Sequence, residues 1–154
     1  YPQLYLLLVG PMEPQDPVPE TILQDLQADP RVVCTGQCPD PAPFYMAMDI
    51  LVLPTHREGF PNTPLEAAAM NLPVVATTAD GCVEAVADGV TGILVPPFDS
   101  QALALALARL VGSPSLRAKM GQAGRQRVLA QFQPQMIWQA LYDNYQQLLS
   151  DKTV

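Results

Sequence analysis

Short, continuous apolar segments separated by stretches of helical character are the feature that most constrains the fold of this chain. Each is about as long as one strand, and the strands predicted around them are residues 4–9, 31–35, 50–53, 74–76 and 92–95. Strands that are apolar on both sides belong to parallel sheets covered by helices on both faces, and right-handed crossovers make such a sheet doubly wound. The sequence therefore predicts a Rossmann-like α/β domain whose ligand binds beyond the carboxyl ends of the strands.

Helices alternate with these strands and then fill the last third of the chain. Ala and Leu alternate over residues 101–108 with the period of a strand, but both are strong helix formers, and Asp99 or Ser100 can cap a helix there. Ser113 and Pro114 place a proline at the first position of the next helix. The predicted helices are 20–27, 43–48, 63–70, 83–87, 101–108, 114–129 and 134–149. One apolar stripe marks the last of them, formed by Ile137, Leu141, Tyr145 and Leu148.

Composition and charge exclude several classes of protein. With 49% hydrophobic and 15% charged residues, the chain is not disordered, and its 154 residues suffice for one domain with a buried core. The net charge of −7 argues against binding to nucleic acid or to a membrane through a basic patch. No apolar run approaches the roughly 20 residues of a membrane span, and no signal peptide is recognisable. We expect a cytoplasmic protein, with peripheral binding to the inner face of the membrane left open.

The cysteines and the histidine do not form a recognisable metal motif. Cys34, Cys38 and Cys82 are an odd number, the Cys34-x3-Cys38 pair has no second pair, and His56 is the only histidine. We therefore expect reduced thiols and no metal site.

Two glutamates eight positions apart, Glu58 and Glu66, frame the most informative stretch of the chain. Glu58 falls in a Gly-containing loop after the apolar run 50–53, and Glu66 lies about one turn into the helix that follows. A loop leading into a helix N-terminus presents unpaired N–H groups to an anion such as a phosphate. An ionised glutamate is a pure acceptor that can hold two hydroxyl groups. The pattern indicates a sugar nucleotide, with its diphosphate at the helix N-terminus and one glutamate at each sugar end.

Three motifs, in this order, carry a resemblance to a known family: residues 52–60 continued through 66–69, then 72–76, then 89–96. From residues 9–10 to about Phe132, the chain resembles the family 4 (group 1) glycosyltransferases. The resemblance implies the two-domain GT-B architecture and retaining transfer. It also implies that residues 1–154 are the nucleotide-sugar-binding C-terminal domain, truncated at its N-terminal edge and without the acceptor domain.

The resemblance assigns roles around the two glutamates. It implies that Glu58, the catalytic candidate, contacts hydroxyls of the donor sugar, and that the backbone of Gly59 and Phe60 approaches the sugar and the phosphates. Glu66 would bind the ribose. The diphosphate and ribose would also be held by the residues at the helix start, Asn62, Thr63, Pro64 and Leu65. The alternatives are a solvated surface charge for Glu58 and a partner of the helix dipole for Glu66.

Two further groups of residues have more open assignments. Gly36, Gln37 and Cys38 correspond to the family loop against which the nucleotide base packs, although a plain connecting loop explains them nearly as well. His56 and Arg57 would line the substrate loop, with contacts to substrate or to a phosphate. Retaining chemistry in this family does not require an enzyme base at His56.

The chain also departs from the family pattern. Asn71 stands where the family usually has Gly, and Asn is the next-best residue for a left-handed position after a helix. Glu84 lies in a segment that resembles a Gly-x-x-Glu element of the family, and we interpret it as the cap of a short helix. An Arg and a Lys that grip the donor diphosphate in the family are missing, and the few basic residues present offer no obvious substitute.

These observations together predict a glycosyltransferase domain. The full enzyme would transfer a hexose from a nucleoside diphosphate sugar, such as a UDP-sugar, to a saccharide or lipid-linked acceptor held by the N-terminal domain, with the anomeric configuration kept. Bacterial surface polysaccharide synthesis is the expected setting. Backbone donors rather than a metal would stabilise the phosphate charge, and no cofactor is expected. We expect the 154-residue chain alone to fold, to bind donor weakly and to transfer nothing.

The sequence leaves two alternatives to this prediction. The first is a non-catalytic module of the same fold that binds a nucleotide sugar, which the intact Glu58 and Glu66 disfavour. The second is another GT-B activity such as a nucleotide-sugar epimerase, which would require acidic and histidine residues that the chain largely lacks.

Overall fold

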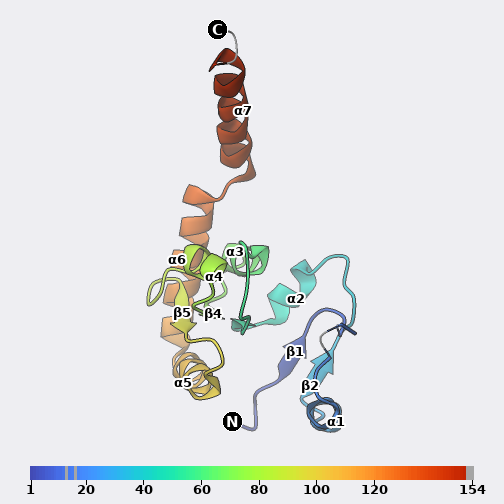
Figure 1. Cartoon of the computed structure of the whole chain (residues 1–154). Coiled ribbons are helices and arrows are strands. Elements are labelled where there is room, and N and C mark those ends of the chain that lie inside the picture. Colours follow the sequence, from blue (N-terminus) through green and yellow to red (C-terminus); the bar gives the residue numbers. More distant parts are fainter. Residues whose placement is uncertain (13, 16, 152–154) are drawn as a thin grey trace. The chain divides into compact units, whose positions relative to one another are not determined.

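A computed structural model describes residues 1–12, 14–15 and 17–151 of the chain (Figure 1). The chain divides into two compact units, residues 1–48 and residues 49–154, and each contains one parallel sheet. Among the described residues, no helix is both long enough and apolar enough to cross a membrane.

The first unit is a two-stranded parallel sheet with two helices. Strand β1 (Leu6–Leu8) pairs with β2 (Val32–Cys34), so that Leu6 lies opposite Val32. Helix α1 (Glu20–Ala28) joins the two strands, and α2 (Ala42–Ala47) follows β2. Both strands form where the apolar runs predict them, but each is shorter than its run.

The second unit is built on three parallel strands that lie side by side in sequence order. They are β3 (Leu51–Leu53), β4 (Val74–Thr77) and β5 (Gly92–Val95). Helix α3 (Asn62–Ala69) connects β3 to β4, and α4 (Asp80–Ala85) connects β4 to β5. Because all three strands run in the same direction, the loops that follow them leave from one edge of the sheet. Ligands of parallel sheets bind at this edge.

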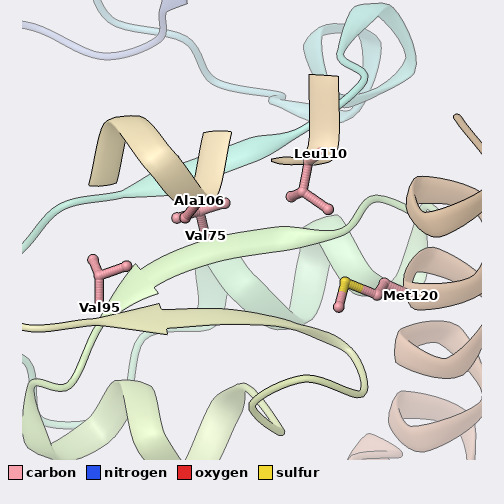
Figure 2. Close-up of a cluster of buried hydrophobic side chains, with 5 residues drawn as sticks. All are labelled: Val75, Val95, Ala106, Leu110 and Met120. Atoms are coloured by element: carbon pink, nitrogen blue, oxygen red, sulfur yellow. The ribbon is translucent and has the colours of Figure 1, made fainter. Parts of the chain in front are cut away.

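Helices cover both faces of this sheet. All four residues of β4 are buried, and their side chains alternate between the two faces. Figure 2 shows the cluster on one face, where residues of β4 and β5 meet helices α5 (Ser100–Val111) and α6 (Pro114–Gln131). The cluster consists of Val75, Val95, Ala106, Leu110 and Met120. Val74 and Ala76, on the opposite face, are also buried, as the predicted two-sided covering requires.

The C-terminal third is helical, as predicted. The Ala and Leu alternation lies in α5, which Asp99 caps by accepting a hydrogen bond from the Ala102 amide at 2.8 Å. Helix α6 begins at Pro114 after the cap Ser113, and α7 (Pro134–Asp151) is the last helix of the described residues. The prediction for the fourth helix was inaccurate: α4 begins at Asp80 rather than Val83, because the chain already turns after the buried Ala79.

Helix α6 approaches α3 closely at two glycines. A Cβ atom on Gly121 would overlap the carbonyl oxygen of Asn71, and one on Gly124 would lie 3.2 Å from the Cβ of Ala68. Asn71 has φ 61°, the left-handed conformation expected after the end of α3. The Arg125 guanidinium donates a hydrogen bond to the carbonyl of Ala69, the last residue of α3. Helix α3, which contains Glu66, is therefore held from one side by the backbone of α6.

Candidate functional site

The loop between β3 and α3, residues 54–61, places Glu58 at the carboxyl edge of the three-stranded sheet. The Glu58 side chain is half-buried, whereas those of His56 and Arg57 are exposed. Gly59 is exposed as well, and Phe60 keeps 42% of its surface accessible. We call residues 54–61 the Glu58 loop. Its position is the one that the sequence predicts for a ligand-binding loop.

Neighbouring elements hold the Glu58 loop at several points. The Thr77 hydroxyl at the end of β4 donates a hydrogen bond to the carbonyl of Thr55. The amide of Gly81, in α4, donates a long bond of 3.4 Å to the carbonyl of Glu58. A Cβ on Gly81 would overlap the Gly59 carbonyl and lie 2.9 Å from the Phe60 Cα. Only a glycine at position 81 lets α4 approach the loop this closely.

A buried thiol lies near the Glu58 carboxylate. Cys82 is fully buried, and this burial, followed by the negative charge of Glu58, raises the pKa of the Cys82 thiol. The thiol therefore stays neutral near pH 7. All three cysteines are free thiols. Within the described part of the chain, no three His, Cys, Asp or Glu side chains gather closely enough to hold a metal ion.

The start of α3 continues directly from the Glu58 loop. Pro61, at the cap position, is buried, and its side chain has no acceptor, so α3 has no side-chain N-cap. First-turn amides of such a helix are available to an anion. Asn62 is exposed, Thr63 and Leu65 are half-buried, and Pro64 is buried. Glu66 is the fifth helical residue and is exposed to solvent.

An aromatic stack lies beside the Glu58 loop. The rings of His56 and Phe98 stack with their centroids 4.5 Å apart and an interplanar angle of 14°. Phe98 follows β5 and has φ 62°, an uncommon backbone conformation for a residue with a ring. A cavity of about 190 Å³ adjoins the stack at the carboxyl edge, lined by Pro54, His56, Thr77, Val95, Pro96, Phe98, Asp99, Ser100 and Leu103. His56 thus packs against an aromatic ring on one side of the loop.

The prediction that Glu84 caps α4 is wrong. Glu84 is the fifth residue of this six-residue helix, so its side chain lies too far along to cap the N-terminus. Ala79 occupies the cap position instead. The Glu84 carbonyl accepts a hydrogen bond from Arg127 at 2.6 Å, which makes this residue part of the contact between α4 and α6.

The predicted base loop lies in the first unit, after β2. Gly36 has φ 68°, and its carbonyl accepts a hydrogen bond from the Gly10 amide at 3.1 Å. Gln37 is exposed, and the Cys38 thiol donates to the carbonyl of Asp40 at 2.8 Å. These residues therefore form a tight turn at the carboxyl end of their own sheet.

Three residues with structural roles at the Glu58 loop were not identified as such from the sequence. Gly81 contacts the loop backbone, and Phe132 and Arg127 lie at the end of α6, where the Phe132 ring packs on Phe60. The Gly81 position was visible only as part of the Gly-x-x-Glu resemblance. The contact between Phe60 and Phe132 joins positions far apart in the sequence, and no spacing pattern signals it.

Comparison with known proteins decides the family. The family described as glycosyl transferases group 1 matches residues 1–113, which are 113 of the 154 residues. This chain belongs to that family. The capsular polysaccharide biosynthesis glycosyltransferase CapM from Staphylococcus aureus is 37% identical over 146 residues, covering 95% of this chain and 38% of CapM. This group 1 glycosyltransferase chain spans between 34% and 43% of the length of the first three curated relatives that it matches.

Solved structures confirm the α/β fold predicted from the sequence. HepE from Anabaena, in complex with UDP-glucose, superposes with a TM-score of 0.86 at 27% identity, covering 96% of this chain and 42% of HepE. The C-terminal domain of the group 1 glycosyl transferase LpcC from Francisella tularensis superposes with a TM-score of 0.75 at 31% identity. That match covers 87% of this chain and 72% of the LpcC domain. The GT-B assignment made from the sequence motifs is therefore confirmed.

Proposed function

We propose that this chain is the donor-binding domain of a retaining glycosyltransferase and binds a nucleoside diphosphate sugar along the Glu58 loop and the start of α3. The observation that carries the proposal is the position of these segments. A glycine-containing loop with a half-buried carboxylate runs into an uncapped helix N-terminus at the carboxyl edge of a parallel sheet. A similar protein, HepE, has been crystallised with UDP-glucose, which supports a sugar nucleotide as the ligand class.

Each part of the donor has a proposed partner in the second unit. The Glu58 carboxylate accepts hydrogen bonds from hydroxyls of the donor sugar, and the exposed backbone at Gly59 and Phe60 approaches the sugar and phosphates. The amides of Asn62 and Thr63 at the start of α3 meet the diphosphate, and Pro64, which has no N–H, and Leu65 line the same helix start. Glu66 accepts hydrogen bonds from the ribose.

The chemistry proposed for this site is electrostatic. The bond from the anomeric carbon to the diphosphate oxygen breaks, a bond to the acceptor oxygen forms on the same face of the sugar, and the proton of the acceptor hydroxyl passes to the departing diphosphate. Negative charge then develops on the departing diphosphate, and preorganised N–H groups at a helix N-terminus stabilise such charge without rearranging. We propose that transfer requires no metal ion, which activity in the presence of a chelator would check.

The remaining roles concern the base and the acceptor. We propose that Gly36, Gln37 and Cys38 meet the nucleotide base through backbone groups. The acceptor, a saccharide or a lipid-linked saccharide, would be held by a domain outside this chain, and CapM suggests surface polysaccharide synthesis as the setting. We therefore propose that the 154-residue chain binds donor but does not transfer it, and that it works in the cytoplasm.

Titration of the purified chain with UDP-glucose, GDP-mannose and ADP-glucose tests the proposal. Calorimetry should show that at least one sugar nucleotide binds, and that free glucose or mannose does not compete. The nucleotide that binds most tightly identifies the base. If none of the sugar nucleotides bound to the folded chain, the proposed function would be wrong.

A further inference from the structure

The residue directly after α6, Phe132, packs against Phe60, one of the two aromatic side chains of the Glu58 loop. Phe132 is the C-cap residue of α6, and its ring centroid lies 5.9 Å from that of Phe60, with the two planes tilted by 35°. Such tilted aromatic pairs attract one another beyond the area that they bury. The Phe132 ring is half-buried, so it is a fixed surface against which the more exposed Phe60 can rest.

Arg127 holds this arrangement together from one turn earlier in α6. Its guanidinium lies 5.0 Å from the centroid of the Phe132 ring, within the range of a cation–π interaction. The same guanidinium donates hydrogen bonds of 2.6 Å to the carbonyls of Ala85 and Glu84. These are the last two carbonyls of α4, where the helix dipole favours a positive charge.

The two contacts of Arg127 lead to the Glu58 loop by separate routes. One passes through the Phe132 ring to Phe60. The other passes through α4, because Gly81 in that helix touches the backbone of Gly59 and the Cα of Phe60. The loop has no helix or strand of its own in residues 54–61, so contacts from outside determine how well ordered it is. A loop already ordered before the ligand arrives binds more tightly, because less freedom is lost on binding.

We propose that Arg127 and Phe132 are positioning residues for donor recognition, which hold the Glu58 loop in its ligand-binding conformation without touching the ligand. This inference rests on the proposed function, since it assumes that the loop meets the donor sugar. It adds two residues, more than sixty positions away from Glu58, that the predicted site does not include. It also makes the end of α6 the element that links the loop to α4.

The proposed positioning role affects binding of the sugar nucleotide and binding of the nucleoside diphosphate differently, whereas a general loss of stability would weaken both together. The Glu58 loop faces the sugar, whereas the start of α3 meets the diphosphate. Loosening the loop should therefore weaken binding of the sugar nucleotide more than binding of the corresponding nucleoside diphosphate. The ratio of the two affinities is the readout, and it does not change when a variant merely reduces the folded fraction.

The experiment compares Phe132→Ala, Phe132→Tyr and Arg127→Met with the unchanged chain. Calorimetry with UDP-glucose and UDP, or with the better binding pair from the titration above, gives the affinity ratio. Phe132→Ala should weaken sugar-nucleotide binding roughly threefold to tenfold, the equivalent of one aromatic pair, and should leave diphosphate binding nearly unchanged. Phe132→Tyr keeps the aromatic ring and should give the same affinity ratio as the unchanged chain. Arg127→Met should act in the same direction as Phe132→Ala.

Two matched controls come from exposed positions. Leu129→Ala removes an exposed apolar side chain three residues before Phe132, and Arg109→Met removes an exposed arginine from the last turn of α5. Neither should change the affinity ratio. If Phe132→Ala does not fold, Phe132→Leu replaces it, because leucine fills the space but lacks the aromatic face that Arg127 contacts.

Hydrogen exchange of the Gly81 amide, which donates to the Glu58 carbonyl, provides a second measurement without ligand. Exchange there should be faster in Phe132→Ala than in the unchanged chain, and normal in Phe132→Tyr. An unchanged affinity ratio in both Phe132→Ala and Arg127→Met would overturn the inference, as would equal losses for both ligands. If the unchanged chain binds UDP but no variant alters the ratio, only the positioning role fails. If the unchanged chain binds no nucleotide or sugar nucleotide, the proposed function fails as well.

Discussion

Helices α6 and α7 have equal lengths and similar beginnings, yet they differ in what they contact. Each has 18 residues and begins at a proline. Helix α6 has little separation of apolar and polar faces, but it buries Met120, Gly121 and Gly124. Helix α7 carries the clear apolar stripe predicted from the sequence, and its four residues, Ile137, Leu141, Tyr145 and Leu148, are each at least 50% exposed. The apolar pattern alone therefore did not identify the helix that supports the site.

The difference shows what makes α6 a support for the site. Helix α6 approaches α3 through Gly121 and Gly124. Because glycine has no Cβ, the backbone of α6 can lie directly against Asn71 and Ala68. Its arginines then bond to helix-end carbonyls, Arg125 to α3 and Arg127 to α4. Close backbone packing of this kind excludes larger residues at the two glycines, whereas an exposed apolar stripe tolerates substitution.

The largest expected effect is a loss of folding stability on substitution of Gly121 in α6. Gly121→Ala places a methyl group on the Asn71 carbonyl, so the two helices must move apart. Although alanine favours helices, overpacking should lower the free energy of unfolding by roughly 1–3 kcal/mol. Urea unfolding followed by circular dichroism measures this change.

The matching substitution on α7 is Leu141→Gln. Glutamine keeps the helix propensity, and the leucine side chain is half exposed. The free energy of unfolding should therefore change by less than about 0.5 kcal/mol. An equal loss in Gly121→Ala and Leu141→Gln would mean that the two helices do not differ as described.

A smaller effect on stability, but a clear one on binding, is expected at Gly81. Gly81→Ala pushes a methyl group into the backbone of Gly59 and Phe60, which displaces the Glu58 loop. We expect sugar-nucleotide affinity to fall about tenfold, which corresponds to about 1.4 kcal/mol. Gly112→Ala is the control, because its Cβ would meet only the carbonyl of Ala108, at 3.3 Å. If calorimetry finds equal affinities in Gly81→Ala and Gly112→Ala, then α4 does not help to hold the Glu58 loop in place.

Local signals predicted most of the fold and the position of the Glu58 loop, but they did not predict the contacts between elements. Apolar runs and prolines located the strands and long helices, and Asn71 was correctly predicted to be left-handed. The contacts of Gly81 with Gly59 and of Phe132 with Phe60 depend on how elements pack in three dimensions. A single sequence contains no period or spacing that reports such pairs. A local pattern can also mislead. The apolar stripe of α7 predicts a buried face, but its residues are exposed.

The most direct test of the proposed donor site compares Glu66→Gln with Glu58→Ala, each titrated with the sugar nucleotide and with its nucleoside diphosphate. Glu66→Gln should weaken both ligands at least several-fold, since a hydrogen bond to a charged group contributes roughly 1.5–3 kcal/mol. Glu58→Ala should weaken the sugar nucleotide and leave the diphosphate within a few-fold, because Glu58 is assigned to the sugar alone. Melting temperatures of both variants should stay close to that of the unchanged chain. Unchanged binding in Glu66→Gln, or equal losses of both ligands in Glu58→Ala, would contradict the proposed site.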